Sequence, residues 1–185
     1  MVGRWISWLN AYKDNPDPLA RLAGTVALVV AGNQPFYPLY LYAIVGAESW
    51  PKWLTLTTLP LFAAVPAVAR RHSLAGRAML PIVGVANTVL TVKLIGTGTA
   101  VELCLLPGVV LSTVLFRSSE RLVMLGVAAL PFAAYLLLDG AVGAPLQLYS
   151  EANYRSIIAM HAISVGSLLA LIGYLVASIL PQHES

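Results

Sequence analysis

LARLAGTVALVVAGNQPFYPLYLYAI, residues 19–44, contains a single charged residue, Arg21, in a run long enough to cross a lipid bilayer. A membrane-spanning helix needs about 20 mostly apolar residues, and similar runs recur along the chain. Of the 185 residues, 58% are hydrophobic and 10% are charged, whereas soluble domains carry roughly 25% charged residues. A soluble fold of this size needs more polar surface, so the sequence predicts an all-α integral membrane protein.

The apolar runs predict one domain, a six-transmembrane-helix bundle over residues 18–181. Asp17 and Pro18 form a typical helix start, and Pro35 predicts a kink in the first span. Gly96-Thr97-Gly98 predicts a tight turn, after which Thr99 and Glu102 have the spacing of a capping box. The expected spans are residues 19–44, 51–69, 74–95, 100–116, 120–138 and 154–180.

Residues 1–13 are too short to cross a bilayer, but their apolar side chains recur on one helical face. We interpret them as a short N-terminal interfacial amphipathic helix, with a disordered terminus as the alternative. Tryptophan and tyrosine favour the headgroup region of a bilayer. The expected interfacial anchors are Trp5, Trp8, Tyr12, Trp50 and Trp53.

The lysines and arginines indicate the orientation. Basic loops stay on the cytoplasmic side of a membrane. With six spans, one side receives Arg4, Lys13, Arg21, Arg70, Arg71, Arg77, Arg117 and Arg121, and the other receives Lys52, Lys93 and Arg155. This bias predicts a multi-pass protein of the cell (inner) membrane with cytoplasmic N- and C-termini.

Several functional classes find no support in the sequence. The net charge of +3 is carried by short loops beside apolar spans, so nucleic acid is not an expected partner. No phosphate-binding loop, zinc-protease motif or nucleophile elbow is present. Of the three histidines only His161 lies in a span, so we expect neither cofactor nor metal, and no enzyme activity.

Polar side chains within the spans are costly in lipid and often functional. Asn33 and Gln34 precede Pro35 in mid-span, Asn87 lies on the third span, and His161 lies in the outer half of the sixth. These residues could contact a ligand or ion at a broken helix. Alternatively, they bond neighbouring helices, which is the interpretation we favour. His161 could act as a pH switch, but a neutral, bonded ring is the more usual state.

Lys93 and Glu102 flank the Gly96–Gly98 turn and should lie at similar depth on antiparallel helices. An ion pair would lower the cost of each charge. In the alternative, Lys93 extends toward the interface and Glu102 serves only its cap. The sequence leaves both interpretations open.

Residues 96–126, GTGTAVELCLLPGVVLSTVLFRSSERLVMLG, carry a family resemblance. Gly96-Thr97, the stretch 103–106 and Glu120-Arg121 resemble the hexahelical membrane domains of bacterial class III adenylate cyclases and membrane sensor histidine kinases. The Ala144-Pro145 loop before a last long span also fits. The resemblance implies a sensor or regulatory anchor, often dimeric. Unlike that family, this chain ends without a linker or an output domain, so we expect it to act through a partner. The alternative is that it is part of a longer protein.

Our leading hypothesis is therefore a non-enzymatic sensor-like module, or an accessory subunit of a membrane complex. Its expected partners are the lipid bilayer and other membrane helices, in a homo-oligomer or a larger complex. The second hypothesis is a small transporter or channel-like protein, whose mid-membrane site would be the kink at Asn33–Pro38 together with Asn87 and His161. An intramembrane enzyme or a lipid-handling protein is the third hypothesis. Its acid–base candidates are Glu102, His161 and Asp139, and nothing in the sequence motivates catalysis by them.

Overall fold

The computed structural model describes residues 2–46 and 50–179, with the side chains of residues 2, 3, 5, 6 and 139 left out. The described part of the chain is all-α and contains no strand. In chain order the helices are α1 (Val2–Lys13), α2 (Pro18–Asn33), α3 (Phe36–Val45), η1 (Trp50–Thr58), α4 (Leu59–Arg71), α5 (Ser73–Ile95), η2 (Thr97–Thr99), η3 (Val101–Cys104), α6 (Leu105–Val114), η4 (Ser118–Glu120), α7 (Arg121–Ala141) and α8 (Glu151–Ala177).

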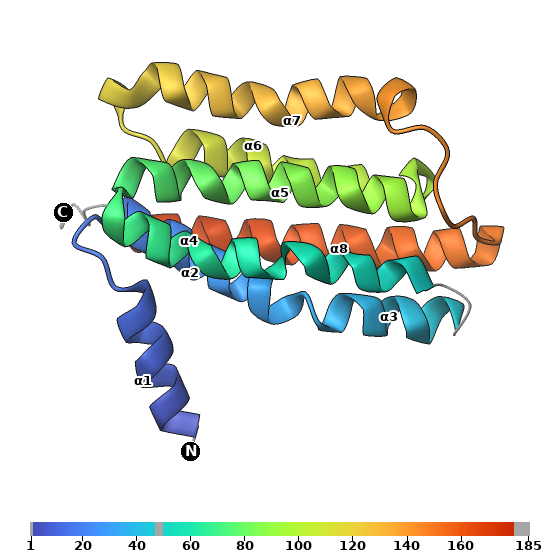
Figure 1. Cartoon of the computed structure of the whole chain (residues 1–185), viewed down its shortest axis with the longest axis horizontal. Helices are drawn as coiled ribbons and strands as arrows, with labels where there is room; N and C mark the ends of the chain where they lie inside the picture. The colour runs from blue at the N-terminus through green and yellow to red at the C-terminus, as the bar shows by residue number, and fades with distance from the viewer. Residues whose placement is uncertain (1, 47–49, 180–185) are drawn as a thin grey trace, which may run out of the picture.

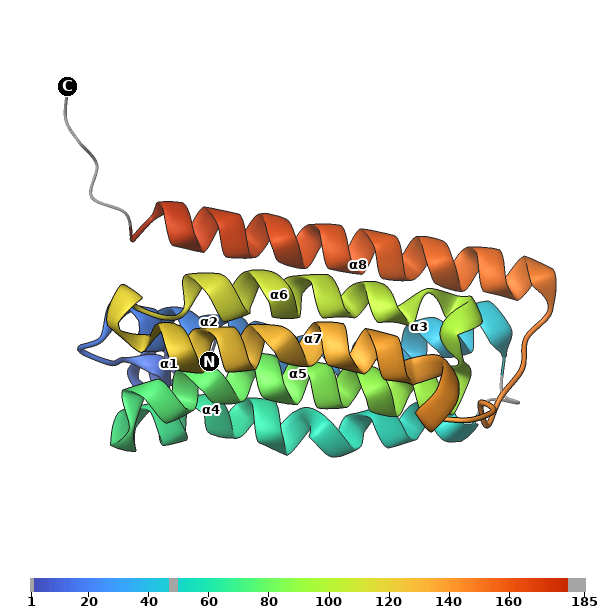
Figure 2. The same ribbon diagram turned by 90° about the horizontal axis from the view of Figure 1, so that it is seen from above.

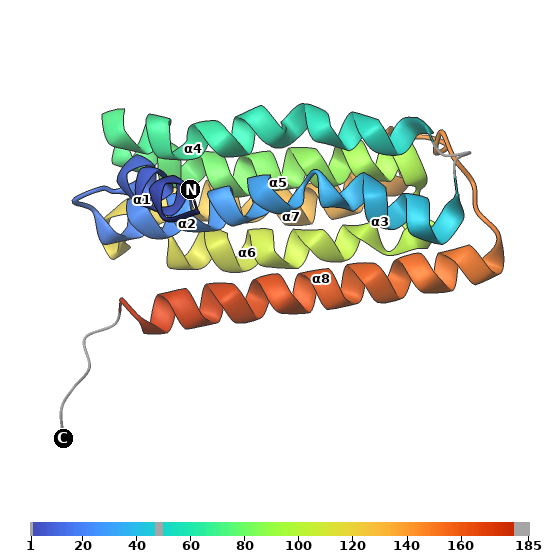
Figure 3. The ribbon, with the colours of Figure 1, turned by 90° about the horizontal axis from the view of Figure 1, so that it is seen from below.

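The long helices form an up-and-down bundle around α5, which contacts α2, α4, α6 and α7. Figure 1 shows α7 on one side of the bundle and α3 on the opposite side. The views in Figures 2 and 3 agree that α4 and α8 run along opposite edges. The main apolar core is built from buried side chains of α2, α4, α5, α6, α7 and α8, such as Val26, Val65, Leu80, Leu111 and Ile172.

Four helical segments of the described chain are long and apolar enough to cross a membrane. They are Trp50–Arg71, Ser73–Ile95, Ser118–Leu138 and Glu151–Ala177. This finding supports a membrane protein. The predicted first and fourth spans are interrupted instead of continuous, for two separate reasons.

The first predicted span breaks where Pro35 stands. α2 ends at Asn33 and α3 begins at Phe36, and the Tyr37 N–H donates to the Gln34 carbonyl oxygen at 3.1 Å. Proline cannot donate a helical hydrogen bond and crowds the preceding turn, so the predicted distortion is confirmed. α2 and α3 together still run the length of the bundle (Figure 3).

The predicted capping box at the start of the fourth span is wrong. Thr99 donates its hydroxyl to the Gly96 carbonyl oxygen at 2.7 Å, and Ala100 takes a left-handed φ of 55°. The residue before η3 is therefore Ala100 and not Thr99, and η3 begins at Val101 without a side-chain cap. α6, the α-helical part of this span, runs only from Leu105 to Val114.

The N-terminal helix α1 leaves one end of the bundle and runs across the bundle axis (Figure 1). Its last turn is fixed to α4, because the Tyr12 hydroxyl donates to the Ala63 carbonyl oxygen at 2.8 Å. The Arg70 guanidinium lies 5.1 Å from the centre of the Tyr12 ring, and Trp8 is stacked on the same ring. If the bundle axis follows the membrane normal, this direction places α1 along the membrane surface, as an interfacial helix requires.

Candidate functional site

A cavity of about 130 Å³ lies between the helices near the α2–α3 break. Most of its surface is apolar, but several polar side chains line it. It contains room for several water molecules or a small head group. Four of the six predicted intramembrane residues line it, namely Asn33, Gln34, Asn87 and His161. Its other walls are Val30, Tyr37, Thr55, Thr88, Thr91, Val101, Cys104 and Ser164.

One side of the cavity is a hydrogen-bonded group from three helices. The Gln34 amide nitrogen donates to the Thr58 hydroxyl at 2.7 Å and to the Asn87 side-chain oxygen at 3.3 Å. The Thr58 hydroxyl lies 2.7 Å from the same Asn87 oxygen and can donate to it. Through Gln34 and Asn87 these bonds join the α2–α3 break to η1 and α5.

Thr58 is the last residue of η1, which is a 3₁₀ helix. Thr55 donates its hydroxyl to the Lys52 carbonyl oxygen, and Thr57 donates to that of Leu54, both at 2.7 Å. Such bonds compete with the α-helical pattern and favour the tighter turn. Lys52, 1% exposed, donates to the Gly46 carbonyl oxygen at 2.9 Å and so satisfies the C-terminus of α3.

His161 also lines the cavity, and it is 1% exposed. Its Nδ1 lies 2.7 Å from the Thr99 carbonyl oxygen, and its Nε2 lies 2.9 Å from the Tyr37 hydroxyl. A carbonyl oxygen only accepts, so Nδ1 carries a hydrogen. In the neutral ring, Nε2 then accepts from Tyr37. His161 thus bonds two neighbours, and these bonds connect α8 with α3 and with the turn before η3.

Two polar groups at the cavity are not satisfied by the residues the structure describes. The Gln34 side-chain oxygen has no hydrogen-bond partner, although Gln34 is only 8% exposed. The Asn33 side chain is exposed and makes no hydrogen bond to another described residue. An unpaired buried polar atom costs about 1–3 kcal/mol, so such a group calls for an explanation.

Beside the cavity lies a wider groove of about 950 Å³ between α2–α3 and α8. The groove and the cavity share Val30, Asn33, Cys104 and Ser164, so the two spaces adjoin. The remaining groove lining is mostly apolar and includes Val29, Ile44, Met160, Ile163, Leu168 and Leu171.

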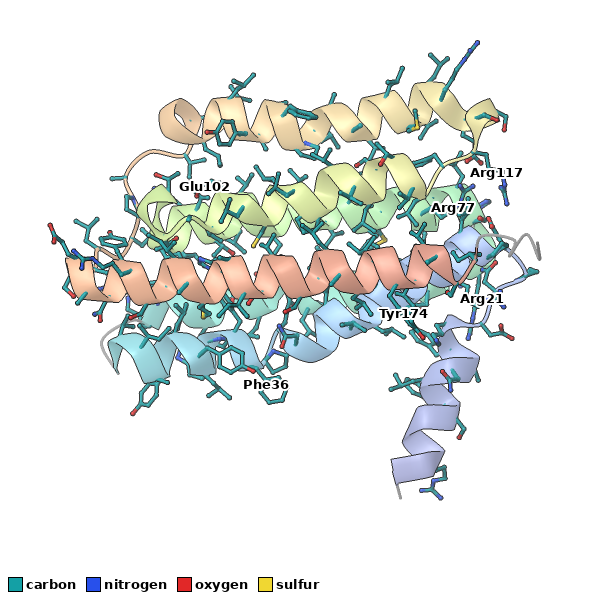
Figure 4. The ribbon with its side chains drawn as sticks, turned by 180° about the vertical axis from the view of Figure 1, so that it is seen from behind. Arg21, Phe36, Arg77, Glu102, Arg117 and Tyr174 are labelled. Atoms are coloured by element: carbon teal, nitrogen blue, oxygen red, sulfur yellow. The ribbon has the colours of Figure 1, made fainter. Side chains whose placement is uncertain are left out.

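Lys93 and Glu102 do not line this cavity. The Lys93 ammonium donates to the carbonyl oxygens of Val142 at 3.2 Å and Ala144 at 2.8 Å, in the loop between α7 and α8. Glu102 lies near the end of the bundle opposite to Arg77 (Figure 4). The ion pair between Lys93 and Glu102 stays a prediction. The anchors Trp8, Trp50 and Trp53 are exposed, and the Trp5 side chain lies outside the described part.

At the other end of the bundle, charged residues join the starts of three helices (Figure 4). Arg77 contacts Glu120, Asp17 and the Leu115 carbonyl oxygen, and Arg117 donates to Asp17 at 2.9 Å. The pKa of Asp17 is lowered. Burial raises it, but hydrogen bonds from Ser73 and the Leu19 amide and the charges of Arg77 and Arg117 outweigh burial. The sequence analysis used Arg77 and Arg117 only to predict the orientation of the chain in the membrane.

The sequence analysis missed Tyr37, which lines the cavity, and it missed Thr58 and Thr99 as hydrogen-bond partners of cavity-lining side chains. Tyr37 carried a signal, because it stands between Pro35 and Pro38, one turn beyond Asn33. Among the described residues, no three His, Cys, Asp or Glu side chains gather in a way that could hold a metal ion. No protein-family model, curated protein or solved structure matches the chain.

Proposed function

We propose that the chain is a non-enzymatic, sensor-like membrane module, or an accessory subunit, that crosses a bacterial inner membrane six times with cytoplasmic termini. The observation that carries the proposal is the cavity at the α2–α3 break, whose walls come from helices on several sides of the bundle. An occupant of such a cavity contacts all of these helices at once. It therefore favours whichever helix arrangement it fits best, which is the physical basis of a sensor.

The surface of the bundle supports action through helix packing. α7 packs mainly on α5 and α6, and its outer face carries the exposed side chains Leu122, Leu125 and Leu136. Gly126 on α7, and Gly166 and Gly173 on α8, have nothing within 4 Å of a Cβ built on them. Small residues allow close approach of a neighbouring membrane helix. These faces suit lipid, a second copy or another membrane protein.

Cross-linking in native membranes tests this proposal. Intact membranes that contain the tagged chain are treated with a membrane-permeant cross-linker, and the purified chain is treated in the same way. We expect a cross-linked species larger than the monomer in native membranes, either a homo-oligomer or a defined complex. A monomer alone in both samples would contradict action through helix packing.

A small transporter is the second candidate, and one observation favours it. The cavity touches both Asn33 and His161 beside a broken helix, which is where transporters bind substrate. A transporter must open this cavity to water. Sealed vesicles containing the chain that admit glycerol or protons, and lose this flux in Asn33→Leu, would favour the transporter over the sensor.

A further inference from the structure

We propose that the groove and the cavity together bind an uncharged lipophilic molecule with a hydroxyl head, which enters sideways from the bilayer between α3 and α8. The inference deepens the proposed function and rests on it only in that a sensor needs a ligand. The test below measures whether the site is occupied and does not measure association between proteins. The ligand proposal and the proposed function can therefore each fail without the other.

The polarity of the two spaces specifies an amphipathic molecule. Both spaces present mostly apolar surface, but the hydroxyl and amide side chains of their linings gather in the smaller cavity, whereas the larger groove is lined mainly by apolar side chains of α2, α3 and α8. From Ser156 to Leu171 the groove follows α8 for about 20 Å at the helical rise of 1.5 Å per residue. A hydrocarbon tail fits the groove, and a small polar head fits the cavity.

The absence of charged side chains from the described lining favours an uncharged head group. Neither the cavity nor the groove is lined by a described lysine, arginine, aspartate or glutamate. A charged head group in this position would lack a counter-charge, which is expensive in a low-dielectric interior. Fatty acid anions, phospholipid phosphates and quaternary amines are therefore poor occupants.

The unsatisfied side-chain amides of Gln34 and Asn33 favour a hydroxyl as the head group of the ligand. The Gln34 side-chain oxygen is buried without a partner, and the neighbouring Asn33 amide is open to the groove. A hydroxyl both donates and accepts, so it can donate to Gln34 and accept from Asn33. It satisfies the Gln34 amide in either orientation of that group, whereas an ester, a ketone or an alkane offers no donor.

Photo-cross-linking in phosphatidylcholine nanodiscs tests the proposal on the full chain. The probe is a diazirine derivative of 1-dodecanol, and the labelled peptides are identified by mass spectrometry. We expect labels concentrated on 29–44 and 156–171, competed by 1-dodecanol but not by dodecane or dodecyltrimethylammonium. Labels spread equally over the exposed face of α7, or competition by dodecane, would overturn the proposal.

Two variants on one helix make the test specific. Ala159 lines the groove, whereas Ala162, three residues further on, is exposed and does not. Ala159→Phe should remove most of the labelling, and Ala162→Phe should leave it unchanged. Equal labelling of both variants would show that the groove is not the site.

A third variant tests the head group. Gln34→Met removes the unsatisfied amide and should weaken competition by 1-dodecanol about fivefold, the effect of one net hydrogen bond. Because Gln34 also bonds Thr58, the folding of the Gln34→Met variant is checked by thermal unfolding. Ala159→Phe supplies an independent result. Unchanged competition in folded Gln34→Met would mean that the cavity holds only water.

Discussion

Arg77 and Glu120, 43 residues apart in the chain, form a two-pronged ion pair at the end of the bundle where α5 and α7 begin. The Arg77 Nη1 and Nη2 atoms lie 2.7 and 2.6 Å from the two carboxylate oxygens. This planar geometry is the strong form of a charge-assisted hydrogen bond. Because Asp17 before α2 contacts the same guanidinium, one arginine connects three helix starts.

Arg77→Met should be strongly destabilising. Arg77 is 1% exposed, and its removal takes one donor from Glu120, from Asp17 and from the Leu115 carbonyl oxygen. Arg117 still contacts both carboxylates. Breaking a fully buried pair costs about 3–5 kcal/mol. Because the Glu120 side chain is 17% exposed, we expect a loss at the lower end of that range or below it. The measurement is unfolding in mixed detergent micelles. Arg121→Met, at an exposed position of the same region, is the control and should change stability by less than about 0.5 kcal/mol. Equal effects of the two substitutions would contradict the role of Arg77.

Acid should weaken the same end of the bundle through Asp17. The folded protein holds the pKa of Asp17 below its ordinary value of 3.8. The stabilisation from a lowered pKa is fully present above the unfolded value and is lost as pH falls through the folded one. The stability gap between the wild type and Asp17→Asn should therefore be constant above pH 3.8 and shrink below it. The exposed Asp14→Asn is the control, and a gap that widens in acid would reverse the argument.

Asn87→Leu should lower the free energy of unfolding by about 1 kcal/mol, the size of an interhelical hydrogen bond in a membrane protein. The substitution removes the oxygen that Gln34 and Thr58 contact. Thermal unfolding measures the loss. Thr113→Val, which removes an exposed hydroxyl from α6, is the control. A neutral or stabilising Asn87→Leu would show that this group does not hold α5 to the α2–α3 break.

The protonation of His161 can be read directly by nitrogen NMR of the labelled protein. We expect a hydrogen on Nδ1, which contacts the Thr99 carbonyl oxygen, and an accepting Nε2. Tyr37→Phe should shift the Nε2 resonance and leave the Nδ1 hydrogen in place. Tyr40→Phe, an exposed residue of the same helix, should change neither. A hydrogen on Nε2 alone would contradict the geometry.

The sequence predicted the features that depend on local chemistry. A run of apolar residues predicts a helix, and Pro35 predicts the break, because each effect acts within a turn. The same reasoning placed Asn33, Gln34, Asn87 and His161 in the membrane. It could not show that these four line one cavity, since helices meet in pairs that no local pattern specifies.

The failures came from contacts between distant segments. Thr99 and Glu102 had the spacing of a capping box, but the Thr99 carbonyl oxygen bonds His161. A Cβ built on Gly98 would lie 3.2 Å from the Tyr154 ring, so α8 packs closely on this turn. Such packing overrides a local capping preference, which is worth only about 1 kcal/mol. The sequence could not predict the partners of Arg77 either, because they also come from distant segments of the chain.

The central claim is that a groove beside α8 opens a mid-membrane cavity lined by polar side chains to lipid. A spin label at Ser164, which lines both spaces, tests it most directly after Cys104, the one cysteine of the chain, is changed to alanine. Collision rates with oxygen, which concentrates in lipid, are compared with those of a water-soluble nickel complex in reconstituted bilayers. We predict that oxygen collisions dominate at this position. Dominant collisions with the nickel complex would contradict the account, because they would place Ser164 in water.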